Sequence, residues 1–151
     1  MVVAPHPPDD PFDLARFVLA QDHVFGLVCN ELRQGRKRSH WIWYIFPQVA
    51  GLGSSDMTRK YAISGLAEAR AYLAHPVLGP RLIEVTQLML GVRDRDIGQI
   101  MGSPDDAKFR SCMTLFGQAA PDNPAFAAAL DKYFGGAPDA ATLRHLAQGG
   151  R

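Results

Sequence analysis

Hydrophobic residues recur every three or four positions along most of the chain, which is the period of an amphipathic α-helix. The first such segment runs from residue 10 to residue 35 and is interrupted at 21–23, so it predicts two short helices or one bent helix. Further helices are expected over 64–75, 80–92, 96–100, 103–116, 123–134 and 139–148. Convincing strands are absent, so the pattern predicts an all-α fold, a single compact domain of about seven or eight short helices.

Residues typical of helix ends flank these segments. Asp10-Pro11 is expected to start the first helix, and Gly35 to end that region in the left-handed conformation. Ser103-Pro104, followed by two acids, is the strongest helix start, because a capping hydroxyl, a proline and negative charge all suit a first turn. Asp96, Asn123-Pro124 and Asp139 predict three further starts.

The run from Trp41 to Phe46 is compatible with either a helix or an extended segment. Aromatic and β-branched residues favour a strand, but the run is short and Pro47 must end it. Trp41 and Trp43 would face the same side in a strand and different sides in a helix, where one can pack inside while the other lines a cleft. The five residues at 51–55, Gly-Leu-Gly-Ser-Ser, predict a flexible loop.

Bulk composition excludes several classes of protein. The chain has 151 residues, enough for one domain, and its net charge of +1 provides no global field for binding nucleic acid or membranes. No apolar run approaches the ~20 residues of a membrane helix. Cys29 and Cys112 lie in apolar helical patterns, which predicts buried reduced thiols and neither a disulfide nor a zinc site. Residues 1–9 are rich in proline and polar groups, which predicts a mobile tail before a domain at 10–151 and a cytoplasmic location.

The segment 36–48 is the strongest candidate for a binding site. Arg36, Lys37 and Arg38 lead directly into a block that contains both tryptophans. Cations beside flat rings suit an anionic, partly planar ligand, with Lys37 and Arg38 neutralising charge while a ring stacks on the planar group. The rings available for this are Trp41, Trp43 and Tyr44. His40, beside these cations, is the candidate general acid or base if a reaction occurs.

Two other segments offer polar groups. Gly53 and Ser54 lie in the glycine-containing loop, where backbone N–H groups and hydroxyls can face an anion, although the loop lacks the ending of a Walker motif. Lys108 and Ser111 are three residues apart and share a helix face opposite the hydrophobic stripe. A polar pair of this kind ordinarily faces solvent. None of the histidines has the spacing of metal ligands, so no metal is expected.

The chain resembles the bacterial family catalogued as domain of unknown function 1810, from about residue 10 to residue 148. The resemblance implies a small, mainly α-helical domain of the fold group named after an uncharacterised mycobacterial protein, and it implies no established activity. It also draws attention to Lys108 and Ser111, which lie in a matching segment. The matching segments are Asp10–Leu14, Arg36–Gln48, Gly51–Gly53, Tyr61–Ile63, His75-Pro76, Leu78-Gly79, Arg81-Leu82, Asp106–Phe116 and Asp139–Leu146.

The leading hypothesis is a cleft that binds a phosphorylated or nucleotide-like small molecule, with no cofactor and no specific nucleic-acid partner. Gly53, Ser54 and Ser111 would supply hydrogen bonds, and Lys108 would join the cations already named. The sequence leaves open whether catalysis follows; hydrolysis of a glycosidic or phosphate-ester bond would be the reaction. Two alternatives remain. The aromatic-basic surface can bind a protein partner, or the motif is architectural, with rings in the core and cations paired with Asp56, Asp105 or Asp106.

Overall fold

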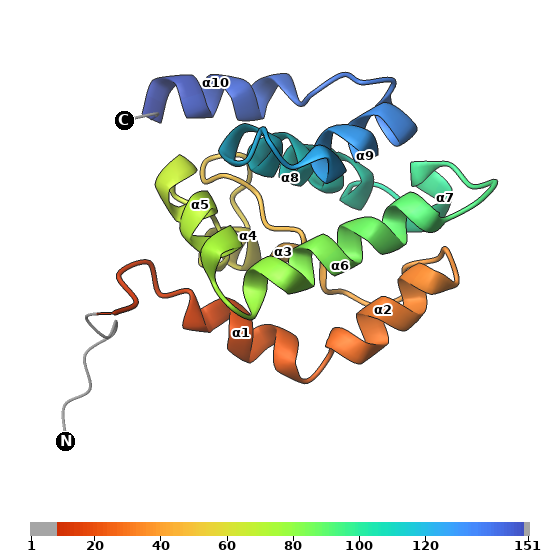
Figure 1. Cartoon of the computed structure of the whole chain (residues 1–151), viewed down its shortest axis with the longest axis horizontal. Coiled ribbons are helices and arrows are strands. Elements are labelled where there is room, and N and C mark those ends of the chain that lie inside the picture. Colours follow the sequence, from red (N-terminus) through yellow and green to blue (C-terminus); the bar gives the residue numbers. More distant parts are fainter. Residues whose placement is uncertain (1–8, 150–151) are drawn as a thin grey trace.

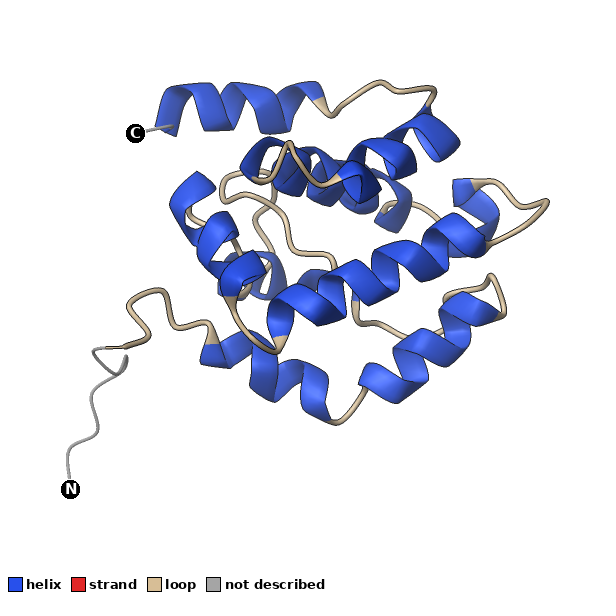
Figure 2. Cartoon of the chain, in the orientation of Figure 1, coloured by secondary structure: helices blue, strands red, loops and turns tan. Residues whose placement is uncertain are grey.

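A computed structural model describes residues 9–149, and this part of the chain contains ten α-helices and no β-strand (Figures 1 and 2). The all-α prediction is confirmed, with more helices than the seven or eight expected. The predicted tail at 1–9 lies, except for Asp9, outside the described residues. The helices are α1 (Ala15–Asp22), α2 (Phe25–Arg33), α3 (Ile42–Ile45), α4 (Asp56–Lys60), α5 (Leu66–Ala74), α6 (Leu78–Gly91), α7 (Ile97–Met101), α8 (Asp105–Ala119), α9 (Pro124–Phe134) and α10 (Ala140–Gly149).

Helices α6 and α8 form the middle of the domain. Helix α8 packs against α3, α5, α7, α9 and α10, while α6 packs against α2, α5 and α9. Helices α1 and α2 lie at one end of the molecule and α10 at the opposite end (Figure 1). None of the helices in this part of the chain is long and apolar enough to cross a bilayer. Because neighbours surround α8, it is buried on more than its hydrophobic stripe, and the residues it presents to α10 become part of the interior.

Several helix ends match the sequence predictions. Gly35 has φ of +70°, and the N–H groups of Gly35 and Arg36 bond the carbonyls of Leu32 and Glu31, the two bonds of a Schellman motif. Asp96 forms a capping box with Gln99. The predicted starts at Asn123 and Asp139 are also confirmed, since each side chain accepts a bond from the first turn of its helix.

Two predicted helix starts differ in detail. Ser103 makes no capping bond to α8, and the Asp106 N–H is instead taken by the backbone carbonyl of Gly102. Helix α1 begins at Ala15, four residues after Pro11, because a turn intervenes. The Asp10 carboxylate nevertheless reaches the N–H groups of Leu14 and Ala15, at 2.7 and 3.1 Å. The Asp10 side chain therefore accepts bonds from the start of α1 across the intervening turn.

The aromatic run that the sequence left open is the short helix α3. Trp41 is 1% exposed and packs in the core with Phe46, which in turn meets Phe109 of α8 edge-on at 4.9 Å between ring centroids. Trp43 is only half-buried. The two tryptophans therefore face different sides, as a helix requires, and α3 is anchored to α8 through its rings.

A buried carboxylate organises the chain that leads into α3. Glu31, on α2, is 4% exposed. Its two oxygens accept four hydrogen bonds: from the backbone N–H groups of Arg38 and Ser39, from the Ser39 hydroxyl and from Nε1 of Trp41, at 2.7–3.1 Å. Burial alone would raise the pKa of Glu31, but these bonds outweigh it and lower the pKa to about 2. The carboxylate is therefore ionised at neutral pH and holds the connection between α2 and α3.

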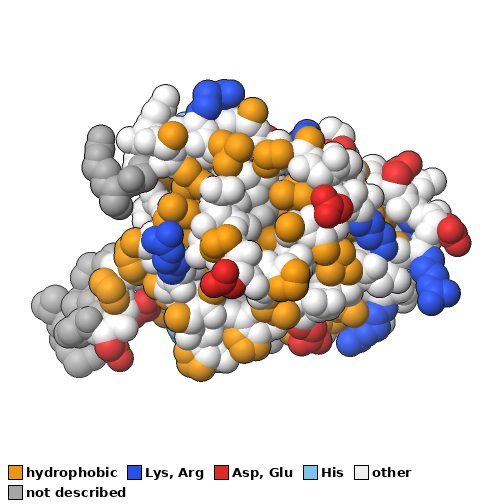
Figure 3. Space-filling model, turned by 45° about the horizontal axis from the view of Figure 1, so that its top comes forward, with side chains coloured by type: hydrophobic (Ala, Val, Ile, Leu, Met, Phe, Trp, Pro, Cys, Tyr) orange, Lys and Arg blue, Asp and Glu red, His pale blue; other side chains and the backbone are white. Residues whose placement is uncertain are grey.

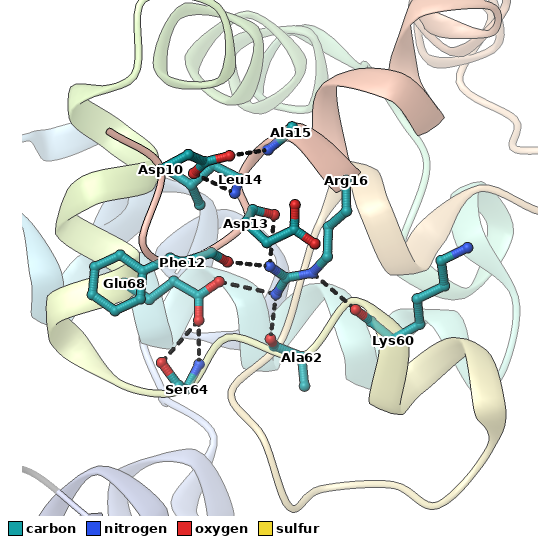
Figure 4. Close-up of polar contacts among 10 residues, drawn as sticks. All are labelled: Asp10, Phe12, Asp13, Leu14, Ala15, Arg16, Lys60, Ala62, Ser64 and Glu68. Carbon is teal, nitrogen blue, oxygen red and sulfur yellow. Dashed lines mark hydrogen bonds and ion pairs between the residues drawn. The ribbon is translucent and has the colours of Figure 1, made fainter. Parts of the chain in front are cut away.

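A second buried carboxylate, Glu68 of α5, fixes the start of α1 (Figure 4). It accepts a bond from Arg16 at 2.9 Å and two bonds from Ser64 at 2.8 Å. The Arg16 guanidinium also bonds the carbonyls of Phe12, Asp13, Lys60 and Ala62. All five guanidinium donors are thus used, and they join α1 to the segment between α4 and α5.

The passage from α5 to α6 requires a glycine. A Cβ at Gly79 would lie 2.1 Å from the carbonyl oxygen of Leu73. Real Cβ contacts are never this short, so a side chain here must push the end of α5 away from α6. The imidazole of His75 accepts the N–H groups of Val77 and Leu78, which fixes the same corner.

We expect Glu31→Gln to lower the free energy of unfolding at neutral pH by about 3 kcal/mol, because a neutral amide cannot accept the same four bonds. The lowered pKa means that the wild-type contribution is complete above the ordinary glutamate pKa and is lost as pH falls towards 2. Urea denaturation at neutral pH and at about pH 3 measures both effects. The exposed Glu84→Gln is the control, and an equal acid sensitivity of wild type and Glu31→Gln would contradict the assignment.

We expect Gly79→Ala to destabilise the fold by about 3 kcal/mol or more, since backbone atoms must move. Gly26→Ala is the matched control, because a Cβ at Gly26 of α2 meets nothing within 4 Å. That variant is expected to be neutral or to gain up to about 1 kcal/mol from the lower entropy of the unfolded chain. Thermal and urea unfolding compare the two, and similar stabilities for both variants would refute the close approach.

Candidate pocket between α8 and α10

A pocket of about 270 Å³ lies where the first turn of α8, the start of α10, α4 and the loop after Pro47 meet. It brings together three residues that the sequence singled out, Gly53, Lys108 and Ser111. A larger pocket of about 610 Å³, between α1 and α5, is mainly apolar and contains no Lys or Arg. Of these two pockets, the smaller one is therefore the better candidate for a charged ligand. Its lining residues are Gln48, Leu52, Gly53, Thr58, Pro104, Ala107, Lys108, Ser111, Asp139 and Ala141.

Lys108 provides the positive charge of this pocket. Its Nζ lies 5.5 Å from the centroid of the Trp43 ring, so the aromatic face supports the ammonium group. Within residues 9–149 no carboxylate lies at ion-pair distance from it. Its charge thus remains available to a ligand.

Ser111 lies at the base of the pocket and is 1% exposed. The sequence places it on a polar face that ordinarily meets solvent, but α10 packs over that face of α8. Its Oγ lies 2.8 Å from Oγ1 of Thr142, and Thr142 donates to Oδ2 of Asp139 at 2.6 Å. Asp139 is also the cap of α10. The hydroxyl groups and the carboxylate therefore form one connected chain along the wall.

The glycine loop follows the opposite wall closely. A Cβ at Gly53 would lie 2.9 Å from Cγ2 of Thr58, and one at Gly51 would lie 2.7 Å from the His145 ring. Gly51 also has φ of +96°, which favours glycine. The two glycines thus let the loop approach α4 and α10. Ser54, next to Gly53, is exposed and is not among the lining residues.

Thr58 contributes a hydroxyl donor. Its Oγ1 accepts a bond from Ser55 at 2.8 Å, while no described atom accepts its own proton. A hydroxyl has a single proton. Thr58 can therefore donate to a ligand in the pocket, on the side where Gln48 adds a side-chain amide.

Two of the predicted ligand-binding residues are engaged elsewhere in the fold. The Lys37 side chain is 5% exposed and forms an ion pair with Asp105 at 2.8 Å, over the Trp41 ring. The Trp41 indole donates to Glu31 in the core. This matches the architectural alternative for these two side chains, and the structure does not bring them into one pocket with Lys108.

The other predicted residues do not line the pocket. Arg38 and His40 are exposed. Tyr44 is half-buried and meets Tyr61 edge-on at 5.3 Å. Burial, reinforced by Tyr61, raises the pKa of Tyr44, so its hydroxyl stays protonated at neutral pH. His40, the candidate general acid or base, is not among the residues that line the pocket.

The distribution of charge on one face of the molecule can be seen directly. On the face seen in Figure 3, positive and negative side chains are interspersed. This agrees with the net charge of +1. Both cysteines are buried free thiols, as predicted, and burial raises the pKa of Cys112 well above its ordinary value. Within the described part of the chain no cluster of His, Cys, Asp or Glu could hold a metal ion.

Sequence reasoning did not assign Asp139, Thr142, Thr58 or Gln48 to the site. Asp139 was visible as a helix start, and that signal is correct, but nothing in the sequence shows that the start of α10 meets α8. Gln48 ends the segment 36–48 but has no assigned role of its own, and Thr58 carries no local signal. They reach the pocket because the chain between α3 and α5 turns back, with Val49 and Ile63 forming an isolated parallel bridge.

The comparisons with known proteins agree with this architecture. A crystal structure of the conserved hypothetical protein Rv1873 from Mycobacterium tuberculosis is similar, with 54% sequence identity and a TM-score of 0.90. The similarity covers 91% of this chain and 99% of that chain. Comparison with curated proteins gave no match. The sequence matches over residues 11–146 the family described as "Protein of unknown function (DUF1810)", and the chain belongs to that family.

Proposed function

We propose that this protein binds a small phosphorylated or otherwise anionic molecule in the pocket between α8 and α10. The observation that carries the proposal is Lys108, a half-buried cation that lines the pocket while no described carboxylate neutralises it. The Thr58 hydroxyl and the Gln48 amide can add hydrogen bonds. A charge-assisted bond from a lysine is a common way to hold a phosphate.

The size of the pocket narrows the class of ligand. Its volume of about 270 Å³ is at the lower end for small-molecule sites. A phosphorylated fragment matches this volume better than a dinucleotide does. Trp43 acts through Lys108, whose ammonium lies over its ring, rather than as a platform for a planar group. The proposal concerns binding and includes no catalytic step.

The arrangement gives less support to a protein-interaction surface built on the aromatic-basic segment. Trp41 and Phe46 are buried, while Trp43 and Tyr44 are half-buried. The large hydrophobic side chains exposed in the described chain are Leu19 and Leu27, on α1 and α2. The segment therefore lacks the exposed rings that dominate binding hot spots.

We expect phosphorylated small molecules to raise the melting temperature of the wild-type protein and to change the fluorescence of Trp43, one of only two tryptophans. A ligand at a hundred times its Kd adds about 2.7 kcal/mol of stability. Lys108→Met should weaken binding by about tenfold or more, because the ammonium is lost. Inorganic phosphate, glycerol 3-phosphate and AMP are suitable probes, measured by thermal shift and by fluorescence titration.

Lys60→Met is the matched control. Lys60 lies 5.4 Å from the Tyr61 ring centroid, nearly the geometry of Lys108 over Trp43, but it does not line this pocket. The control should bind the probes as the wild type does. No shift with any phosphate, or equal losses in the two variants, would refute the proposal.

A further inference from the structure

The hydroxyl chain along the pocket wall has a fixed direction. Thr142 has one hydroxyl proton, and the Asp139 carboxylate that it bonds at 2.6 Å can only accept. Thr142 must therefore accept at its contact with Ser111, and Ser111 must donate there, at 2.8 Å. The single proton of Ser111 is then used within the fold. Ser111 can present only lone pairs to a ligand, so it can bond a ligand only by accepting from a donor on that ligand.

Asp139 has the same requirement. Its Oδ2 accepts bonds from the N–H and the hydroxyl of Thr142, at 2.9 and 2.6 Å. No group among residues 9–149 donates to Oδ1, although Asp139 lines the pocket. This wall therefore offers acceptors and negative charge, whereas Lys108 and Thr58 offer donors and positive charge.

A simple anion cannot satisfy both sides of this pocket. It would gain the attraction of Lys108 but would offer no donor to the Ser111 hydroxyl or to Oδ1 of Asp139, and Asp139 would repel it. A ligand with an ammonium group would satisfy Asp139 but would bring a second positive charge into a pocket of about 270 Å³ that already contains Lys108. Neutral hydroxyl groups satisfy the acceptors without either repulsion.

We infer that the ligand is a phosphorylated polyol or sugar, whose phosphate lies at Lys108 and whose hydroxyl groups donate to Ser111 and Asp139. This inference rests on the proposed binding of an anion in the same pocket. It adds an orientation to that proposal: the charged end of the ligand faces Trp43 and α4, and the hydroxyl end faces α10.

The test compares three probes of similar size on the intact protein: n-propyl phosphate, glycerol 3-phosphate and phosphoethanolamine. Two added hydroxyl hydrogen bonds predict that glycerol 3-phosphate binds about tenfold more tightly than n-propyl phosphate. Phosphoethanolamine should bind no more tightly than n-propyl phosphate. Fluorescence titration and amide chemical shifts in NMR spectra measure the three dissociation constants.

Two variants test whether Asp139 and Ser111 cause the preference for glycerol 3-phosphate. Asp139→Asn keeps an oxygen that can cap α10, since asparagine is an equally good cap, but places a donor or a neutral oxygen at the pocket. Ser111→Ala removes the other acceptor. In each, the advantage of glycerol 3-phosphate should fall several-fold, while n-propyl phosphate binds at least as well as before. Asp56→Asn, whose side chain is 99% exposed, is the control, and far-UV circular dichroism with thermal unfolding verifies that every variant is folded.

The possible results distinguish a failure of this inference from a failure of the proposed anion binding. Equal binding of glycerol 3-phosphate and n-propyl phosphate would overturn the inference and leave anion binding in place. Tightest binding of phosphoethanolamine would overturn it in favour of a cationic donor. A preference for glycerol 3-phosphate that survives both substitutions would overturn the assignment to Ser111 and Asp139. Binding of none of the three probes would overturn both.

Discussion

The Glu31 carboxylate fixes the chain that leads into α3, the helix that carries Trp43. Four donors from the segment 38–41 converge on it, so the connection after α2 has a single path and delivers Trp41 into the core. Through Phe46 the same segment packs on Phe109, which is on the helix that carries Lys108. The position of Lys108 relative to Trp43 therefore depends on a carboxylate at the end of a different helix.

Buried glutamates serve a general need in a fold made of many short helices. Such a fold contains many connections, and backbone N–H groups in connections have no helical partner. Glu31 bonds two of these groups and Glu68 bonds one, each with a hydroxyl group as a further donor. Burying an ion is costly unless it is fully bonded, and both carboxylates meet that condition. The two buried carboxylates thus serve to build the connections between helices.

The sequence predicts structure that depends on residues close together in the chain, and it misses structure that depends on distant residues. The helix starts at Asp96, Asn123 and Asp139 are correct, because cap and helix are neighbours in the chain. Helices α3 and α4 have four and five residues, too few to show a period. Ser103 fails as a cap because the Gly102 carbonyl takes the Asp106 N–H.

The two candidate lysines also show that the sequence cannot predict contacts between distant segments. The sequence indicated both Lys37 and Lys108 as ligand-binding cations, and both lie beside tryptophan rings in space. Only the fold shows that Asp105 neutralises Lys37 while Lys108 lines a pocket. The spacing of Lys108 and Ser111 correctly indicates a shared face, but whether that face meets solvent depends on α10, about thirty residues later in the chain.

The Arg16 cluster has a consequence for the way in which this protein opens. One guanidinium bonds carbonyls and a carboxylate that lie 44 to 52 positions away in the chain. Each bond fixes the position of the guanidinium and so supports the other bonds. The turn before α1 and the connection between α4 and α5 cannot loosen independently, since releasing either leaves donors of Arg16 unpaired in a half-buried site. The two segments are therefore expected to open together, as one cooperative unit of local unfolding.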